Sequence, residues 1–412
     1  MRSFIFLLLC ILLVQCSSNS TPELTDHIQI LDEIPEHILE MENATIFPGD
    51  SEPRYSMELI PEQSFGEKGE PYLTSISAAV VDDNDRVIIL DVNNDSGTFP
   101  PPNHVYVFNS DGTYHTQIGR MGSGPGEFGM AGLSGVKGGK VLVIDISNQR
   151  LNVYDADDYS IVQTSLFDDW SVQNHEAVKD MRFGFFRPRN DGNLLASFRE
   201  IVPTSGSRLN LKYILVDLDG NVLDPKPWEF TGGFSFNVNT DPPRPSMLAP
   251  PMMGSTVSAL SPNDDLFTMW TKDFLIKKYD SDGNYLSAIY YPITGSPFDV
   301  EDYVGMFGYT RHNIIRGIEE SDESMPTTNP VVASLKIDDE NRIWVTVPMN
   351  PNQDLYEWWI LAPSGELLAK MQRPRELWIY DIKDGYLYTK EIDEETDAEY
   401  VVKYRIEFRE AE

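Results

Sequence analysis

Short apolar stretches alternate with polar turns along most of this chain, from about Tyr55 to Phe408. Each stretch has the period-two pattern of a strand, and the turns are rich in Asp, Asn and Gly, which is typical of consecutive β-hairpins. Sustained helical periodicity is confined to the region around Val300 to Glu320. The pattern therefore predicts an all-β protein of antiparallel strands.

Two kinds of turn follow one another in a regular order. The first kind, as in VDDNDRV and IDDENRI, occurs six times, and the second, as in FNSDGTY and YDSDGNY, occurs five times. One turn of each kind defines a four-stranded unit, which is a propeller blade. The sixth unit lacks its fourth strand, and we expect the N-terminal stretch from Tyr55 to supply it, because closing the ring removes exposed sheet edges. The predicted fold is an all-β, six-bladed β-propeller of four-stranded antiparallel blades over residues 54–409, with the N-terminal strand closing the last blade.

The stretch IGRMGSGPGEFG, Ile118 to Gly129, contains a match to G-x-G-x-x-G. A dinucleotide-binding turn of that form needs a helix after it, so that the helix N-terminus meets the pyrophosphate. The residues that follow, MAGLSGVKGGKV, cannot form this helix. We interpret the stretch as a structural step between two blades, with Phe128 packed between them.

The same stretch, together with the Asp-Gly turn before it, resembles the signature of NHL-type six-bladed propellers. Only the first blade carries this signature well, and the other blades match in turn pattern alone. The resemblance implies the fold and says little about activity, because one fold hosts many functions.

The first residues resemble a bacterial lipoprotein signal. Arg2 precedes the apolar run from Phe4 to Val14, which is too short to span a bilayer of ~30 Å and has the length of a secretory signal core. The run ends in LLVQCSSNS, which resembles a lipobox with Cys16 as the lipidated residue, although Gln15 stands where Gly, Ala or Ser is usual. We expect residues 1–16 to be the signal peptide ending at lipidated Cys16; the alternative is ordinary secretion with Cys16 as an incidental thiol.

Residues 17–53 contain nine Asp or Glu and no Lys or Arg. We expect them to form a solvated acidic tether, with at most one short helix, that lifts the domain off the membrane. The lipobox, tether and propeller together resemble the TolB-like propeller lipoproteins of Bacteroidetes. The expected location is the bacterial cell envelope, with a lipid anchor in the outer membrane and the domain on the periplasmic side or at the cell surface.

The charge balance removes one class of partner. The chain has 32 Lys and Arg against 65 Asp and Glu, which gives a net charge of −33. A field of this sign repels phosphate backbones, so nucleic-acid binding is excluded. The partners that we expect are the membrane, through the N-terminal lipid, and a peptide, glycan or envelope protein bound by a monomer.

Loop lengths point to one face of the propeller. In a four-stranded meander, the connections between blades and those between the second and third strands leave on the same side, which we call the long-loop face. The long connections are of these two types: residues 92–103, 168–180, 201–210, 230–256, 292–330 and 349–355. Binding residues usually lie on loops carried by a rigid scaffold. The alternative is that these insertions only cap the channel mouth.

The candidate binding residues on that face are basic or aromatic. Arg182 opens the innermost strand of the third blade, and the stretch FGYTRHNIIRG is expected over the channel on a short helix. Together they would receive a carboxylate, phosphate or sugar acid, since Arg suits planar anions; the alternative is that each Arg pairs with a neighbouring acid. The candidates are His175, Arg182, Tyr309, Arg311, His312 and Arg316.

No local catalytic motif stands out. The histidines lack metal-binding spacing, and DSDGN and DLDGN lack the Glu that would complete a calcium loop, so they are interpreted as turns. Two function classes remain: a binding propeller, and a metal-dependent, lactonase-like hydrolase or lyase with calcium or zinc at the axis. The inner strands begin with small or apolar residues, which favours binding and leaves no catalytic or metal residue assigned.

Overall fold

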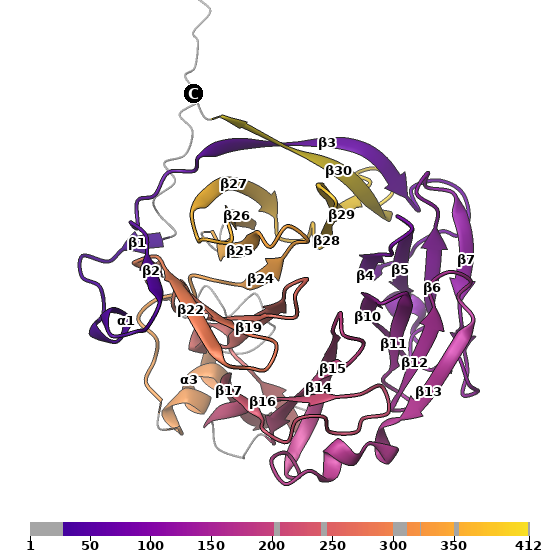
Figure 1. Cartoon of the computed structure of the whole chain (residues 1–412), viewed down its shortest axis with the longest axis horizontal. Helices are drawn as coiled ribbons and strands as arrows, with labels where there is room; N and C mark the ends of the chain where they lie inside the picture. The colour runs from indigo at the N-terminus through magenta and orange to yellow at the C-terminus, as the bar shows by residue number, and fades with distance from the viewer. Residues whose placement is uncertain are drawn as a thin grey trace, which may run out of the picture.

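The structure is a closed ring of six antiparallel sheets around a central channel (Figure 1). The computed structural model describes residues 28–201, 207–239, 245–299, 311–321, 323–349 and 354–410. Within each sheet the strands follow one another from the channel to the rim. The predicted all-β, six-bladed propeller is confirmed.

The first two blades are four-stranded meanders. The first contains β4 (Ile76–Val81), β5 (Val87–Val92), β6 (Asn103–Phe108) and β7 (Tyr114–Ile118). The second contains β10 (Ala131–Lys137), β11 (Lys140–Asp145), β12 (Arg150–Asp155) and β13 (Ile161–Leu166). Between them, β8 (Arg120–Met121) and β9 (Glu127–Phe128) form a short parallel pair.

The third and fourth blades each carry a fifth strand at the rim. The third contains β14 (Met181–Pro188), β15 (Leu194–Glu200), β16 (Ser207–Val216), β17 (Trp228–Asn239) and β18 (Pro245–Leu248). The fourth contains β19 (Thr256–Leu260), β20 (Leu266–Trp270), β21 (Leu275–Tyr279), β22 (Tyr285–Tyr290) and the parallel strand β2 (Ala44–Ile46).

The fifth blade is a regular meander, and the sixth is completed from the other end of the chain. The fifth contains β24 (Ser334–Ile337), β25 (Ile343–Pro348), β26 (Leu355–Leu361) and β27 (Leu367–Pro374). The sixth contains β28 (Ile379–Lys383), β29 (Tyr386–Ile392), β30 (Glu399–Glu410) and β3 (Tyr55–Phe65). Strand β3 runs antiparallel to β30 from Tyr55 opposite Glu410 to Phe65 opposite Val401, so the predicted closure by the N-terminal strand is confirmed.

Helices are few and short in the described residues, and most lie in the connections. The 3-10 helices are η1 (Asn94–Ser96), η2 (Phe167–Asp169), η3 (Ser171–Asn174) and η4 (Pro251–Met253). The α-helices are α1 (Glu36–Leu39) and α3 (Arg311–Glu319), of which α3 falls where the sequence predicts helical periodicity.

The stretch from Ile118 to Gly129 is the step from the first blade to the second, and β10 rather than a helix follows it. Phe128 is fully buried in a cluster that joins apolar side chains of both blades. The Tyr154 hydroxyl donates to the carbonyl oxygen of Gly126 at 2.8 Å, and the Glu127 carboxylate accepts from the Gly124 N–H at 2.8 Å. The interpretation as a structural step is confirmed, and the core lies between blades.

The segment before the propeller departs from the sequence prediction. A solvated tether was expected over residues 17–53, but β1 (Ile28–Ile30) pairs with β23 (Ile293–Gly295), and β2 extends the edge of the fourth blade. Ile38 of α1 is only 1% exposed and packs in a cluster with Tyr290 of β22. The tether prediction is therefore wrong for residues 28–53, because their isoleucines bury against an otherwise open sheet edge. Residues 17–27, and the signal with Cys16, lie outside the described residues.

Candidate functional site

The inner strands enclose a cavity of about 670 Å³ in the central channel. Its lining comes from the inner strands β4, β10, β14, β19, β24 and β28 and from the turns that follow most of them. We call it the channel cavity; each blade contributes to it, as shown by Val81, Val136, Arg187, Leu260, Lys336 and Asp381. It has the size of a small-molecule site. Because these turns lie opposite the long-loop face, the cavity opens on the other side of the disc.

A bulge in β14 directs two side chains of the third blade to the cavity. The register with β15 shifts between Phe183 and Phe186. The hydroxyl of Ser197 occupies the bulge, where it accepts from the Phe185 N–H at 3.0 Å and donates to the Phe185 carbonyl at 2.9 Å. Bulges re-aim side chains, and here both Phe185 and Arg187 line the cavity.

Arg187 is held in place but is not neutralised by a carboxylate in the described part of the chain. Its guanidinium carbon lies 4.9 Å above the centre of the Phe185 ring, and its Nη2 donates to Ser258 Oγ of the fourth blade at 3.3 Å. Its Nε is buried and has no hydrogen-bond partner. A buried N–H without a partner costs free energy, so a shift of the guanidinium that brought this N–H to a ligand in the cavity would be favourable.

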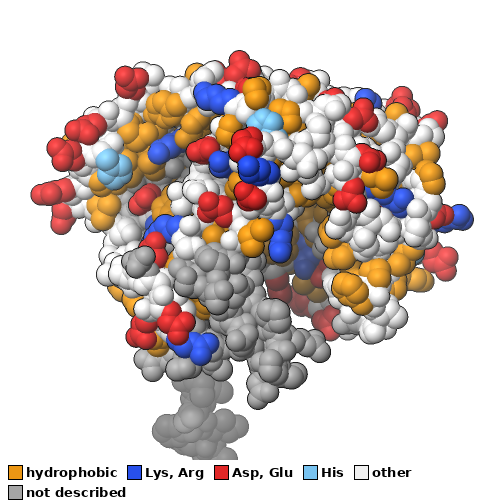
Figure 2. Space-filling view, turned by 90° about the horizontal axis from the view of Figure 1, so that it is seen from below, with side chains coloured by type: hydrophobic (Ala, Val, Ile, Leu, Met, Phe, Trp, Pro, Cys, Tyr) orange, Lys and Arg blue, Asp and Glu red, His pale blue; other side chains and the backbone are white. Residues whose placement is uncertain are grey.

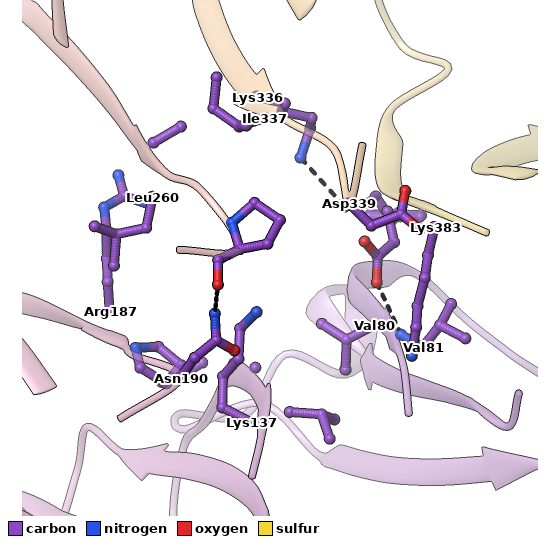
Figure 3. Close-up of a pocket in the computed structure, with 18 of the residues that line it drawn as sticks. Val80, Val81, Lys137, Arg187, Asn190, Leu260, Lys336, Ile337, Asp339 and Lys383 are labelled. Atoms are coloured by element: carbon purple, nitrogen blue, oxygen red, sulfur yellow. Dashed lines mark hydrogen bonds between the residues drawn. The ribbon is translucent and has the colours of Figure 1, made fainter. Parts of the chain in front are cut away.

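Lys336 is the second cation of the cavity. Its Nζ donates to the carbonyl oxygen of Tyr380 in the sixth blade at 3.2 Å. Burial lowers the pKa of Lys336 below its usual value; the charge of Asp381 opposes this shift, and that of Arg187 adds to it. Arg187 and Lys336 both line the channel cavity, so the two cations face a common space. Figure 3 shows them reaching that space from different inner strands.

Several other charges of the cavity wall already have partners. Lys383 Nζ lies 3.1 Å from Asp83 Oδ1, and Arg342 Nε lies 2.6 Å from the buried Asp338 Oδ2. The Asp381 carboxylate accepts from the Val81 N–H at 3.0 Å. These contacts join neighbouring blades or brace turns, whereas Arg187 and Lys336 keep donors free. Lys137, at the end of β10, also lines the cavity.

The candidates predicted on the long-loop face lie outside the channel cavity. Arg182 is exposed and stands directly opposite Arg199 on the neighbouring strand, so two guanidinium groups share one sheet face. His175 is half-buried, and its Nδ1 accepts from the Ala177 N–H at 3.3 Å. The described structure therefore does not place Arg182 and His175 together with the cations of the cavity.

The remaining candidates belong to the region of α3. This helix packs against β17 at the rim, where Ile318 joins a cluster with Phe234 and Phe236, and not over the channel as expected (Figure 1). Arg316 lies 3.8 Å from Glu320, the residue directly after the helix, which is the pairing with a neighbouring acid that the sequence left open. Tyr309 lies outside the described residues, as do the side chains of Arg311 and His312.

Sequence reasoning missed Arg187 and Lys336, although each carries a signal. Arg187 lies in the same stretch as Arg182. It is two residues after Phe185, and this alternation places Phe185 and Arg187 on one side of the strand. Lys336 lies between the apolar Leu335 and Ile337 of an inner strand, SLKI. A charged residue between apolar neighbours of an inner strand indicates a special environment.

No group of three or more His, Cys, Asp or Glu side chains within the described ranges is arranged to hold a metal ion. Among the helices that the structure describes, none is both long and apolar enough to cross a membrane.

The fold and cavity define a six-bladed β-propeller with a ligand-sized channel. The sequence model of the family DUF5128, described as "6-bladed beta-propeller", matches residues 70–210, which run from the first blade into the third. No curated protein shows significant sequence similarity to the chain.

Similar solved structures include two Bacteroides proteins. One, from Bacteroides fragilis and named as exported, is 14% identical with a TM-score of 0.49, over 88% of this chain and 99% of its own. A DUF4221 member from Bacteroides vulgatus is 10% identical with a TM-score of 0.46, over 87% of this chain and all of its own (100%). Regucalcin from Agrobacterium tumefaciens, a calcium-binding protein, is 9% identical with a TM-score of 0.38, over 88% and 96% of the two chains. At these values the similarities carry no argument about ligand or activity.

Proposed function

We propose that this chain is a binding protein of the bacterial cell envelope, attached to a membrane through lipid on Cys16, that takes a small anionic ligand into its channel cavity. The observation that carries the proposal is the buried Nε of Arg187, which has no partner and lines the same cavity as Lys336. Arginine presents paired N–H groups that match the oxygens of a carboxylate or phosphate.

The two cations of the cavity favour an anion at this position, against the acidic balance of the whole chain. The protein carries a net charge of −33, and acidic side chains are spread over the side shown in Figure 2, with basic ones interspersed. Within the cavity, Lys383 is paired with Asp83, so its charge is balanced. Arg187 and Lys336 have no carboxylate within ion-pair distance in the described residues. An anion would satisfy both of them.

The wall also suggests the rest of the ligand. Phe185 is 37% exposed, and its ring, with Arg187 above it, faces the cavity. Leu260, Val136 and Ile337 add apolar surface around the same space. A site with a few polar groups in an apolar wall binds a molecule that has both a polar and an apolar part. We therefore expect an organic acid or phosphate ester with an apolar or ring-shaped body.

The alternative function, a metal-dependent hydrolase or lyase, receives less support. A divalent cation at the axis would need several oxygen or imidazole ligands. Arg187 and Lys336, which line the cavity, would repel such an ion. We therefore keep binding as the proposed function.

The test is a calorimetric titration of the mature protein with citrate and with inorganic phosphate. We expect one site per chain, weakened by added salt, and an affinity loss of about tenfold or more in Arg187→Met, as for a lost hydrogen bond to a charged group. Arg182→Met is the matched control, because it removes an exposed arginine from the opposite face. Absence of binding to both anions, or equal affinity in Arg187→Met and the wild type, would disprove the proposal.

A further inference from the structure

The long-loop face carries the most exposed large apolar side chains of the propeller. Phe99 is 89% exposed, Tyr72 is 74% exposed, and Ile201 and Trp378 are each 62% exposed. Phe99 and Ile201 lie between the second and third strands of the first and third blades, and Tyr72 and Trp378 lie in steps between blades. Both types of connection leave on the long-loop face, so these four exposed residues lie on the same side of the disc.

The described chain also begins on that face. Ile28 of β1 pairs with Gly295 of β23, which lies in the step from the fourth blade to the fifth. Cys16 precedes Ile28 by 12 residues. Whatever its conformation, a chain of that length spans at most about 43 Å, at ~3.6 Å per residue. A lipid on Cys16 would therefore keep Ile28, and with it this edge of the long-loop face, within about 43 Å of the bilayer surface.

We propose that the long-loop face rests on the lipid surface to which Cys16 is anchored, and that the channel cavity opens away from the membrane. The inference rests on the lipid anchor of the proposed function. Tryptophan and tyrosine favour the membrane interface, where the ring is apolar and its polar atom stays hydrated. An envelope ligand would then enter the cavity from the aqueous side.

Charge on the long-loop face is mixed, and exposed acids such as Glu70 and Glu376, close to Tyr72 and Trp378, oppose contact with anionic lipid. Arg182 and Arg199 stand side by side, exposed and without an ion pair among the described residues, and can meet headgroup phosphates. Acidic residues, including the exposed Glu394 and Glu395 of the sixth blade, share the face. The contact is therefore carried by the aromatic side chains, with the arginines adding local attraction.

The test places a fluorescent label at single cysteines of the full-length, lipidated protein. Phe99→Cys and Trp378→Cys report on the long-loop face, and Ser110→Cys and Asp282→Cys, in turns of the first and fourth blades, report on the opposite face. Cys10 is removed with the signal and the Cys16 thiol is acylated, so the label reacts only at the new cysteine. Each protein is inserted into vesicles of phosphatidylethanolamine and phosphatidylglycerol that contain a nitroxide-labelled lipid.

We expect the nitroxide lipid to quench most of the fluorescence at positions 99 and 378 and to leave positions 110 and 282 nearly unchanged. Equal quenching on the two faces, or stronger quenching at 110 and 282, would overturn the inference. Protein that does not float with the vesicles would overturn the lipid anchor and this inference with it. That failure is distinct from a failure of anion binding, which the calorimetric titration detects without any membrane.

Discussion

The Nζ of Lys336 donates a hydrogen bond of 3.2 Å to the carbonyl oxygen of Tyr380, and this contact joins the fifth blade to the sixth at the channel wall. An ammonium group has three N–H donors, so two of them remain for a ligand. The same residue thus links two blades and presents positive charge to the channel cavity, beside Arg187.

Anion binding should depend on pH through Lys336. Because burial lowers the pKa of Lys336, its ammonium loses its proton at a lower pH than an ordinary lysine. Affinity for citrate should fall as the pH rises through that lowered pKa, whereas Arg187 stays charged. Lys336→Met should bind about tenfold more weakly at pH values below the lowered pKa of Lys336 and show a flatter pH profile. Citrate titrations between pH 7 and 10 check this prediction. Lys336→Arg is the control and should keep its affinity over this range. A pH profile of Lys336→Met identical to that of the wild type would refute the prediction.

Arg187→Met should not destabilise the unliganded protein. Methionine retains much of the packing over Phe185, while the substitution removes a buried Nε without a partner. Replacing a buried charge by an apolar group of similar volume is often neutral or stabilising. The melting temperature without ligand should be unchanged or higher. A marked fall would show that the Ser258 contact matters for the fold and not only for the ligand.

A second lysine should make stability depend on pH. Burial lowers the pKa of Lys272 to about 8; Asp273 opposes this shift and Arg208 adds to it. Between pH 8 and the usual lysine value, the unfolded chain binds more protons than the folded one, so the stability that Lys272 contributes rises with pH and is lowest below pH 8.

The wild type should therefore gain on the order of 1 kcal/mol in free energy of unfolding over Lys272→Met between pH 8 and 10, a value that allows for solvent screening. Urea titrations at several pH values measure this difference. Lys226→Met, which replaces an exposed lysine, is the control and should show no such trend. A pH-independent difference for Lys272→Met would contradict the assignment.

Closure of the ring should depend on Phe65 at the end of β3. Its side chain is fully buried, and its ring centre lies 6.5 Å from that of Tyr388 in the sixth blade. Phe65→Ala should lower the free energy of unfolding by about 3 to 5 kcal/mol, measured in urea. Ser56→Ala on the same strand, at an exposed position, should cost less than about 0.5 kcal/mol. Similar values for the two variants would argue against closure by packing.

The packed N-terminal segment can be tested by proteolysis. Ile38 is buried against the fourth blade, whereas its neighbour Leu39 is 63% exposed. Ile38→Asp places a charge in this contact and should detach the segment, so that a glutamate-specific protease cuts at Glu33, Glu36 or Glu40 much faster than in the wild type. Leu39→Asp should leave the rate unchanged. Fast cleavage of the wild type itself would restore the tether interpretation.

The architecture of this protein follows from local sequence features. The alternation of apolar residues and the Asp-Gly turns identify the hairpins, and the missing strand of the last unit identifies the closure by β3. The step at Ile118 to Gly129 was also interpreted correctly, because no helix can follow it. Each of these conclusions depends on residues close together in the sequence, or on a repeat that can be counted.

The channel cavity and the packing of residues 28–53 depend on residues far apart. Arg187 and Lys336 belong to different blades, and only the closed ring brings their side chains to one space. Acidic residues dominate residues 17–53 and predict a solvated tether, but Ile38 and its neighbours gain more from burial on the edge of the fourth blade. The sequence by itself determined the six-bladed fold, since turns and alternation are local. Only the tertiary structure decided that Arg187 and Lys336 line one channel cavity, because burial and electrostatic coupling arise between strands that are distant in the sequence.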